Sequence, residues 1–228
     1  MQSRRQWSPS RPTSLKTLPV GNCTYSASFS PANPAIISCV SSDSHLRIFD
    51  LRSPVSAKYH LTTVIPVHAP PQGPTLPLLS TGQTFAGAVP SEILTHDWNK
   101  YRDTVVATAG VDRVIRTFDI RNPAAGPASV LLGHEYAVRR LAWSPHASDV
   151  LASASYDMTV RVWSDGSTAG PLPQPNTIPV GTQLGVMNRH SEFATGVDWC
   201  LFGTGGWLAS AGWDQRVLVW DAHTLLRG

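Results

Sequence analysis

The sequence has few charged residues, few cysteines and no long apolar segment. Lys, Arg, Asp and Glu together make up 14% of the 228 residues, whereas Pro and Gly contribute 19 and 17 residues. This composition is typical of a loop-rich β protein and argues against a helical one. A chain of this length can bury a sizeable core in one or two domains.

These scarcities exclude several classes of protein. No apolar run approaches the roughly 20 residues of a membrane-spanning helix, so we expect no direct membrane insertion. Cys23, Cys39 and Cys200 have no paired spacing, which favours buried reduced thiols in an intracellular chain over a disulfide or a metal site. The eight histidines lack metal-ligand spacing, and no glycine-rich phosphate loop opens a helix. We therefore expect no metal and no cofactor.

Positive charge is concentrated at the N-terminus. The formal net charge is +3, but Arg4, Arg5, Arg11 and Lys16 lie in the first 20 residues, which contain no acid. The remainder has 14 basic and 15 acidic residues, a balance of −1, so nucleic acid is not an expected partner. Residues 1–13 lack the apolar core of a secretory signal, and we predict a disordered tail, with an organelle transit peptide as the alternative.

One pattern occurs four times along the chain, and each copy contains an inner aromatic, a turn aspartate and a closing aromatic. The inner aromatics are Phe29, Trp98, Trp143 and Trp199; the turn aspartates are Asp43, Asp112, Asp157 and Asp214; the closing aromatics are Phe49, Phe118, Trp163 and Trp220. The closing aromatics lie 69, 45 and 57 residues apart. The middle spacing matches the roughly 40–45 residues of a propeller repeat.

The two longer spacings contain Pro/Gly-rich insertions at 69–88 and 165–181. Proline cannot donate to a sheet ladder, so both insertions are predicted to be loops without strands. Elsewhere, period-two alternation and β-branched runs predict strands, and no stretch has convincing helical periodicity. The predicted strands are 24–30, 35–40, 45–50, 60–65, 92–98, 104–109, 114–119, 128–132, 137–143, 149–154, 159–163, 194–199, 206–211 and 216–220.

From about Cys23 to Asp221 the chain resembles the WD-repeat (WD40) family. The resemblance implies an all-β fold, a β-propeller with about four four-stranded blades in the region 14–228. The repeats would span about 22–50, 89–119, 133–164 and 189–221. In that family the outer strand of the last blade comes from the N-terminus, here from residues 14–20. Four blades predict either an open arc or a strained ring.

One constellation resembles a catalytic triad, namely His134, Ser155 and Asp157. In a WD repeat the same residue types form a structural network, in which the His bonds the Asp, the Ser bonds the His, and the indole of Trp163 donates to the Ser. We therefore predict no catalytic residue. An esterase remains the distant alternative, and it would require an exposed Ser155 hydroxyl.

The other repeats are predicted to have incomplete networks. In the last repeat His190, Asp214 and Trp220 are present, but Ala211 or Gly212 takes the place of the hydroxyl. The two early repeats lack the histidine. Asn22 is the nearest candidate in the first, and the 69–88 insertion interrupts the second after His68.

Acidic and aromatic side chains recur on the loops that enter the inner strands, where propellers usually bind ligands. The acids are Glu92, Glu135 and Glu192, and the aromatics beside them are Tyr136, Tyr156, Phe193 and Trp213. Acids beside aromatics favour a ligand with basic and apolar groups, such as an amphipathic basic helix. The alternative is that these are ordinary solvated loop residues.

Five stretches give a more specific resemblance than the repeat alone. They are 23–31, 93–101, 119–122, 132–140 and 190–198, and in that order they resemble the WD-repeat receptors for the type-2 peroxisomal targeting signal. The resemblance implies a non-enzymatic import receptor of the cytosol and the peroxisome matrix. Its partners would be cargo proteins with an N-terminal signal of the form Arg-Leu-x5-His-Leu, a peroxin co-receptor and docking factors.

The chain departs from that receptor family in its number of repeats. Family members carry six or seven repeats, so the resemblance implies an N-terminally truncated member with weak or no cargo binding. The alternative function is that of a general WD-repeat scaffold, such as a substrate adaptor in a ubiquitin ligase or a chromatin complex.

Overall fold

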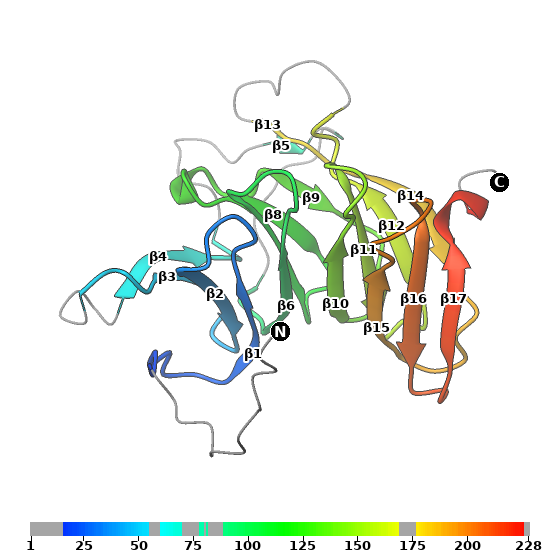
Figure 1. Ribbon diagram of the computed structural model, residues 1–228, viewed down its shortest axis with the longest axis horizontal. Helices are drawn as coiled ribbons and strands as arrows, with labels where there is room; N and C mark the ends of the chain where they lie inside the picture. Colours follow the sequence, from blue (N-terminus) through cyan, green and yellow to red (C-terminus); the bar gives the residue numbers. More distant parts are fainter. Residues whose placement is uncertain are drawn as a thin grey trace, which may run out of the picture.

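Four antiparallel sheets stand side by side in chain order and form an open arc (Figure 1). This computed structural model describes residues 16–54, 60–69, 78–79, 81, 89–168 and 177–225. Within these ranges the chain forms strands and short 3-10 turns but no α-helix. The all-β propeller architecture is confirmed. The predicted tail, 1–13, lies outside the described residues.

Each sheet is one blade. Blade 1 contains β1 (Thr24–Phe29), β2 (Ile36–Ser41), β3 (His45–Asp50) and β4 (Leu61–Pro66). Blade 2 contains β6 (Ile93–Trp98), β7 (Val105–Gly110), β8 (Ile115–Asp119) and β9 (Ser129–Leu131). Blade 3 contains β10 (Val138–Trp143), β11 (Val150–Ser155), β12 (Val160–Ser164) and β14 (Thr182–Met187). Blade 4 contains β15 (Ala194–Trp199), β16 (Trp207–Gly212) and β17 (Val217–Asp221). The 3-10 turns are Pro123–Ala125 and Ala222–Thr224.

Every predicted strand occurs, and its ends agree with the prediction to within one residue. The prediction missed β14, which follows directly on the second insertion. It was also wrong about the insertions, because β5 (Leu78–Leu79) and β13 (Thr177–Ile178) lie within them and pair with each other in parallel. Leu79 and Ile178 are buried in one apolar cluster with Val130 of β9. The proline argument fails here because neither two-residue strand contains a proline.

The expected outer strand of blade 4 is not formed by the described part of the N-terminal segment. Residues 16–20 form no strand, and the Lys16 amine donates to the Leu51 carbonyl oxygen at 2.7 Å, beside blade 1. Blades 1 and 4 lie at opposite ends of the arc (Figure 1), so this segment is far from β17. Ser14 and Leu15 lie outside the described residues.

Two local features repeat in all four blades. The inner strand of each blade pairs with the next strand through a register shift at its start, as between Val138 and Arg140. The residue after each turn aspartate adopts a left-handed backbone, with φ between 63° and 70° at Ser44, Arg113, Met158 and Gln215. The repeated pattern therefore specifies the same bulge and the same turn four times.

The core consists of clusters between consecutive blades. One cluster joins Val40, Leu46 and Ile48 of blade 1 to Trp98 of blade 2. The next joins blade 2 to Trp143, and the third joins blade 3 to Trp199. The inner aromatic of each of these blades is therefore buried against the blade before it. No blade precedes blade 1 among the described residues, and Phe29 is 60% exposed.

The three cysteines are unpaired, as expected, but only Cys39 is buried. Cys23 and Cys200 are exposed, because the residues just outside a strand end lie at the surface. The expectation of buried thiols was therefore wrong for two of the three.

Gly110 at the end of β7 tolerates no side chain. A Cβ atom there would lie 2.0 Å from the Glu92 carbonyl oxygen and 2.8 Å from the Ile93 Cα atom, and neither backbone atom can move independently. We predict that Gly110→Ala lowers the free energy of unfolding by about 1–3 kcal/mol, the cost of overpacking. Urea denaturation measures this change. Gly196→Ala is the matched control, because its Cβ would make ordinary contacts, with Ala211 Cβ at 3.5 Å and with the Ala211 amide nitrogen at 4.0 Å. Equal stability of the two variants would contradict the prediction.

Candidate functional site

A buried chain of hydrogen bonds fixes the turn of blade 3. The Trp163 indole nitrogen donates to Ser153 Oγ at 2.8 Å, and this hydroxyl lies 2.7 Å from His134 Nε2. His134 Nδ1 lies 2.7 Å from Asp157 Oδ2 and donates to it. With a neutral histidine protonated at Nδ1, every donor in the chain has an acceptor. The network therefore connects β11, β12 and the loop that enters β10.

The structure corrects the identity of the hydroxyl, which belongs to Ser153 and not to Ser155. Ser155 Oγ instead donates to the carbonyl oxygens of Tyr136 and Ala137, both at 3.0 Å. Its side chain is fully buried. The exposed Ser155 hydroxyl that an esterase would require is not present.

Blade 4 contains the same network, and it is complete. His190 lies 2.9 Å from Asp214 Oδ2 through Nδ1 and 3.0 Å from Ser210 Oγ through Nε2. The Trp220 indole donates to Ser210 Oγ at 3.3 Å. The prediction that Ala211 or Gly212 replaces the hydroxyl was wrong, because Ser210 occupies the position in β16 that Ser153 occupies in β11.

The early blades use two different partners for the turn aspartate. In blade 1 the Asn22 amide donates to Asp43 Oδ2 at 2.9 Å, which agrees with the expectation for this residue. In blade 2 His68 Nε2 lies 3.1 Å from Asp112 Oδ2, so the 69–88 insertion does not separate this pair as predicted. Phe49 and Phe118 have no indole nitrogen, so neither closing aromatic can extend the network.

Burial and hydrogen bonding set the ionisation of the blade 3 network. Burial lowers the pKa of His134, and Asp157 only partly offsets this effect. Burial alone would raise the pKa of Asp157, but hydrogen bonds from His134, Thr159 and the Glu135 amide outweigh it and hold the pKa well below its usual range. The lowered pKa of each group favours a neutral imidazole beside a carboxylate, which is the pair that the hydrogen-bond chain of this turn requires.

Three of the predicted rim aromatics form a contiguous cluster. Tyr156 lies in the β11–β12 turn, Phe193 in the loop before β15, and Trp213 in the β16–β17 turn. The Tyr156 and Phe193 rings stack with their centroids 4.8 Å apart, and Trp213 lies 5.0 Å from Phe193 and 6.2 Å from Tyr156. Trp213 is 62% exposed. We call these three residues the aromatic platform, which joins blades 3 and 4.

The remaining predicted rim residues are exposed but more dispersed. Glu135 and Glu192 lie at the entries to β10 and β15, and Tyr136, beside Glu135, is exposed outside the platform. Glu92 lies near the Tyr25 hydroxyl of β1 and raises the Tyr25 pKa, so it faces blade 1.

Sequence reasoning did not identify Arg113, whose guanidinium donates to the Glu135 carbonyl oxygen at 3.4 Å and adds a positive charge to this rim. Arg113 directly follows the turn aspartate Asp112, and this position in the repeat could have indicated that its side chain lies at the rim.

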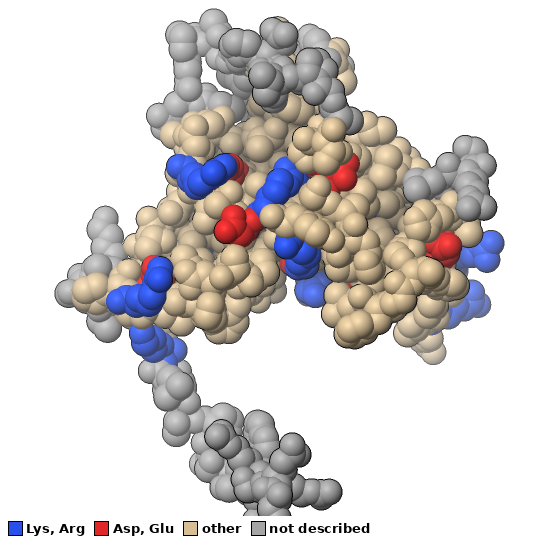
Figure 2. Space-filling view, turned by 45° about the horizontal axis from the view of Figure 1, so that its top comes forward, with Lys and Arg blue, Asp and Glu red and all other residues tan. Residues whose placement is uncertain are grey.

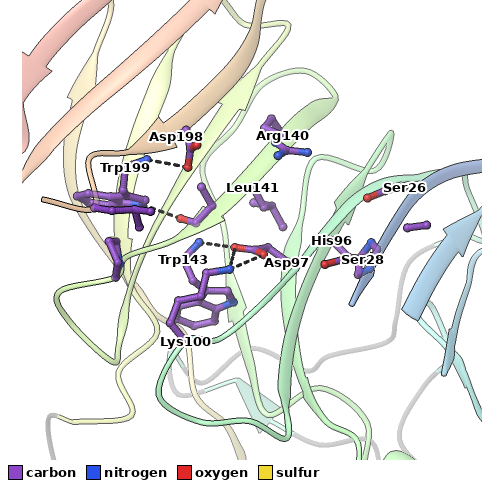
Figure 3. A pocket seen from close by; sticks show the side chains of 14 residues that line it. Ser26, Ser28, His96, Asp97, Lys100, Arg140, Leu141, Trp143, Asp198 and Trp199 are labelled. Carbon is purple, nitrogen blue, oxygen red and sulfur yellow. Dashed lines mark hydrogen bonds and ion pairs between the residues drawn. The ribbon is translucent and has the colours of Figure 1, made fainter. Parts of the chain in front are cut away.

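The concave side of the arc contains a pocket of about 220 Å³ lined by the inner strands of all four blades (Figure 3). Asp97 accepts bonds from the Lys100 amine and from the Trp143 backbone amide, at 2.8 Å each. His96 lies 2.7 Å from Ser38 Oγ, which also accepts a bond from the Trp98 indole at 2.7 Å. The bond from Trp143 to Asp97 joins blades 2 and 3, and the contacts of Ser38 with His96 and Trp98 join blades 1 and 2.

Charges of both signs are mixed on the face shown in Figure 2, with broad uncharged areas between them. Several basic side chains pair with a nearby carboxylate, as in Arg52–Asp50 and Arg121–Asp119. The described residues of this face therefore form no continuous basic surface. The described residues contain no cluster of metal-binding side chains and no helix with the length and apolarity of a membrane span.

Ser153 Oγ accepts a hydrogen bond from the Trp163 indole and donates one to His134. Removing this hydroxyl therefore leaves two buried groups without a hydrogen-bond partner. We predict that Ser153→Ala lowers the free energy of unfolding by about 2–3 kcal/mol. Ser210→Ala should cost about 1 kcal/mol, because its bonds are longer and Trp220 is only half-buried. Urea denaturation measures both changes, with the exposed Ser191→Ala as control. A smaller effect for Ser153→Ala than for Ser210→Ala would refute this ranking.

His96 should make the fold sensitive to acid. Burial and the nearby Arg140 lower its pKa to about 4, against 6.5 in the unfolded chain. Between these pH values the unfolded state takes up a proton that the folded state does not, so stability falls by up to about 1.4 kcal/mol per pH unit as pH decreases. We predict that His96→Gln reduces this slope in urea titrations between pH 6.5 and pH 4. The exposed His223→Gln serves as control, and an unchanged slope in His96→Gln would count against the prediction.

Comparisons with known proteins agree with this architecture. The family model described as "WD domain, G-beta repeat" matches residues 13–50, 126–164 and 181–221, about half of the chain. The chain is 35% identical over 221 residues to the peroxisomal targeting signal 2 receptor of Saccharomyces cerevisiae, covering 88% of this chain and 53% of the relative. It is 37% identical over 218 residues to the receptor of that name from Komagataella phaffii, covering 90% of this chain and 51% of the relative.

The similarity extends to other organisms. The peroxisomal targeting signal 2 receptor of Schizosaccharomyces pombe is 37% identical over 134 residues, covering 59% of this chain and 39% of the relative. The chain thus spans about half the length of the curated relatives that it matches across most of its own length. With four blades of the WD type and a matching family model, the chain belongs to the WD-repeat family.

Proposed function

We propose that the chain is a receptor module in peroxisomal protein import and binds a helical targeting signal of the form Arg-Leu-x5-His-Leu. The proposal rests on its similarity to receptors named for the type-2 signal. The surface feature that carries it is the aromatic platform, with Glu192 directly beside Phe193 and Glu135 on the neighbouring entry loop.

The spacing of the signal fits this surface. Its Arg and His lie seven residues apart, and so do its two Leu residues, which places each pair on one side of a helix. The basic pair would face the exposed Glu135 and Glu192, and the leucines would lie on the rings of Trp213 and Phe193. Arg and protonated His are attracted both to carboxylates and to aromatic faces.

The same proposal includes the partners and the compartments. A peroxin co-receptor would cover the side of the signal helix that faces away from the platform, and docking factors would receive the complex at the peroxisome. The receptor would then move between the cytosol and the peroxisome matrix. Because the chain spans half of its relatives, we expect its cargo affinity without the co-receptor to be weak.

Fluorescence anisotropy with a labelled peptide of the form Arg-Leu-x5-His-Leu, with and without co-receptor, tests this function. We predict that Trp213→Ala weakens binding about tenfold, because it removes an exposed aromatic contact. Glu192→Lys should weaken binding by a similar factor, and more so at low salt, because it replaces attraction with repulsion. Phe202→Ala is the control, since this exposed aromatic follows β15 at the end away from the platform.

Two outcomes would refute the proposal. One is the absence of binding under all conditions, and the other is an unchanged affinity in both variants. A scaffold in a ubiquitin ligase or a chromatin complex would share the fold, and it would co-purify with subunits of those complexes rather than with import factors.

A further inference from the structure

Four polar side chains from three blades line one side of the pocket on the concave side of the arc. Ser26 and Ser28 lie on β1, His96 on β6 and Arg140 on β10 (Figure 3). We call these four residues the junction cluster, because they lie where blades 1, 2 and 3 meet. The contacts described so far assign no role to Arg140 or to the Ser26 hydroxyl.

The two serines point toward blade 2. Ser26 lies opposite Val40 in the β1–β2 pair, and Val40 is buried in the cluster between blades 1 and 2. Ser28 lies opposite Ser38, whose Oγ lies 2.7 Å from His96 Nε2. Residues opposite each other project from the same face of a sheet, so both serines face the junction with blade 2. Their place in the pocket is therefore set by the contact between two described blades and not by where the chain begins.

His96 holds a buried donor without an acceptor. It is 3% exposed. Ser38 Oγ accepts from the Trp98 indole and lies 2.7 Å from His96 Nε2, but 3.3 Å from the Ser28 carbonyl oxygen. The shorter contact receives the hydroxyl proton, so Nε2 accepts and the neutral ring carries its own proton on Nδ1. Within the described part of the chain Nδ1 has no hydrogen-bond partner, although buried polar groups normally have one.

Arg140 adds a positive charge beside this donor. Its charge contributes to the lowered pKa of His96, so the guanidinium and the imidazole lie close together. Arg140 is exposed, and it forms no hydrogen bond or ion pair with another described residue. A water molecule could accept from His96 Nδ1, but an unpaired guanidinium next to it favours an anion.

The acidic groups of the pocket leave the junction cluster positive. Asp97 is paired with Lys100 at 2.8 Å. Asp198 on β15 accepts a backbone amide at 2.9 Å and forms no ion pair with the described residues. Figure 3 shows Asp198 on the side of the pocket away from Ser26. The cluster thus combines N–H and O–H donors with one unbalanced positive charge.

We propose that the junction cluster binds a small oxyanion of the phosphate type, either free or as the phosphate group of a small ester. The forked guanidinium of Arg140 would hold two oxygen atoms, and His96 Nδ1 and the serine hydroxyls would donate to the others. Propellers keep a central channel, so further blades would extend the wall of this pocket of about 220 Å³ and leave it open. A bound anion would connect three blades, and this inference is independent of cargo binding.

Isothermal titration calorimetry of the 228-residue chain with sodium phosphate, at constant pH and ionic strength, tests the proposal. We expect saturable binding at a single site. Arg140→Gln should weaken it about tenfold, because the charged fork is lost. Arg216→Gln, at an exposed arginine just before β17, is the matched control and should leave binding unchanged. Circular dichroism establishes that both variants keep their β-sheet content.

Asp198→Asn should change the affinity in the opposite direction. It removes a negative charge from the pocket while keeping an oxygen that accepts the backbone amide, so phosphate should bind severalfold more tightly. The gain should shrink at high salt, because mobile ions screen the repulsion between the carboxylate and the anion.

The imidazole signals of His96 in NMR spectra locate the bound anion. Phosphate should shift them in the unmodified chain but not in Arg140→Gln, while the signals of the exposed His223 stay unchanged. Glycerol phosphate distinguishes the two sources of the anion. Tighter binding than that of inorganic phosphate supports a small ester as the ligand, and weaker binding supports the free anion.

Three outcomes overturn the proposal. The first is the absence of saturable phosphate binding. The second is an equal loss of affinity in Arg140→Gln and Arg216→Gln, which would indicate attraction to positive charge anywhere on the surface. The third is binding that leaves the His96 signals unchanged, since the anion would then lie outside the junction cluster.

Discussion

The burial of an inner-strand aromatic against the preceding blade is the contact on which the arc depends. A single blade is a small sheet with two faces, and it cannot cover both of them with its own residues. Trp98, Trp143 and Trp199 each cover the exposed face of a neighbour while they bury their own large side chains. Indole nitrogens that donate to Ser38 and Ala142 satisfy the polar part of two of these contacts.

The hydrogen-bond networks have a different task, which is to hold the turns at one rim. In blades 3 and 4 a neutral histidine connects the turn aspartate to a buried serine and to the closing tryptophan. The turns of blades 1 and 2 also reach the entry loop of the next blade, through Ser44 to the Ser91 carbonyl oxygen and through Arg113 to the Glu135 carbonyl oxygen. The aromatic platform is the third contact of this kind, so the proposed binding surface also forms part of the scaffold.

The strands could be predicted from the sequence because they depend on local signals, namely period-two alternation and turn residues at fixed positions. The hydroxyl of the network could not be assigned, because Ser153 and Ser155 are two residues apart and point to the same side of β11. Only the pairing register decides which of them meets His134. In blade 2, the intervening insertion concealed the pair of His68 and Asp112. A long loop adds little to the cost of closing such a contact, so sequence distance was a poor guide.

The parallel pair of β5 and β13 has a consequence for the order of folding. It joins two insertions that lie far apart in the chain, and Val180 bridges to Val130 beside it. Leu79 of β5 and Ile178 of β13 both pack on Val130 of β9, so the pair depends on a strand of blade 2 being in place. A contact formed after the rate-limiting step slows unfolding without accelerating folding. We therefore expect the pairing of the two insertions to slow unfolding of the assembled blades more than it changes their rate of folding.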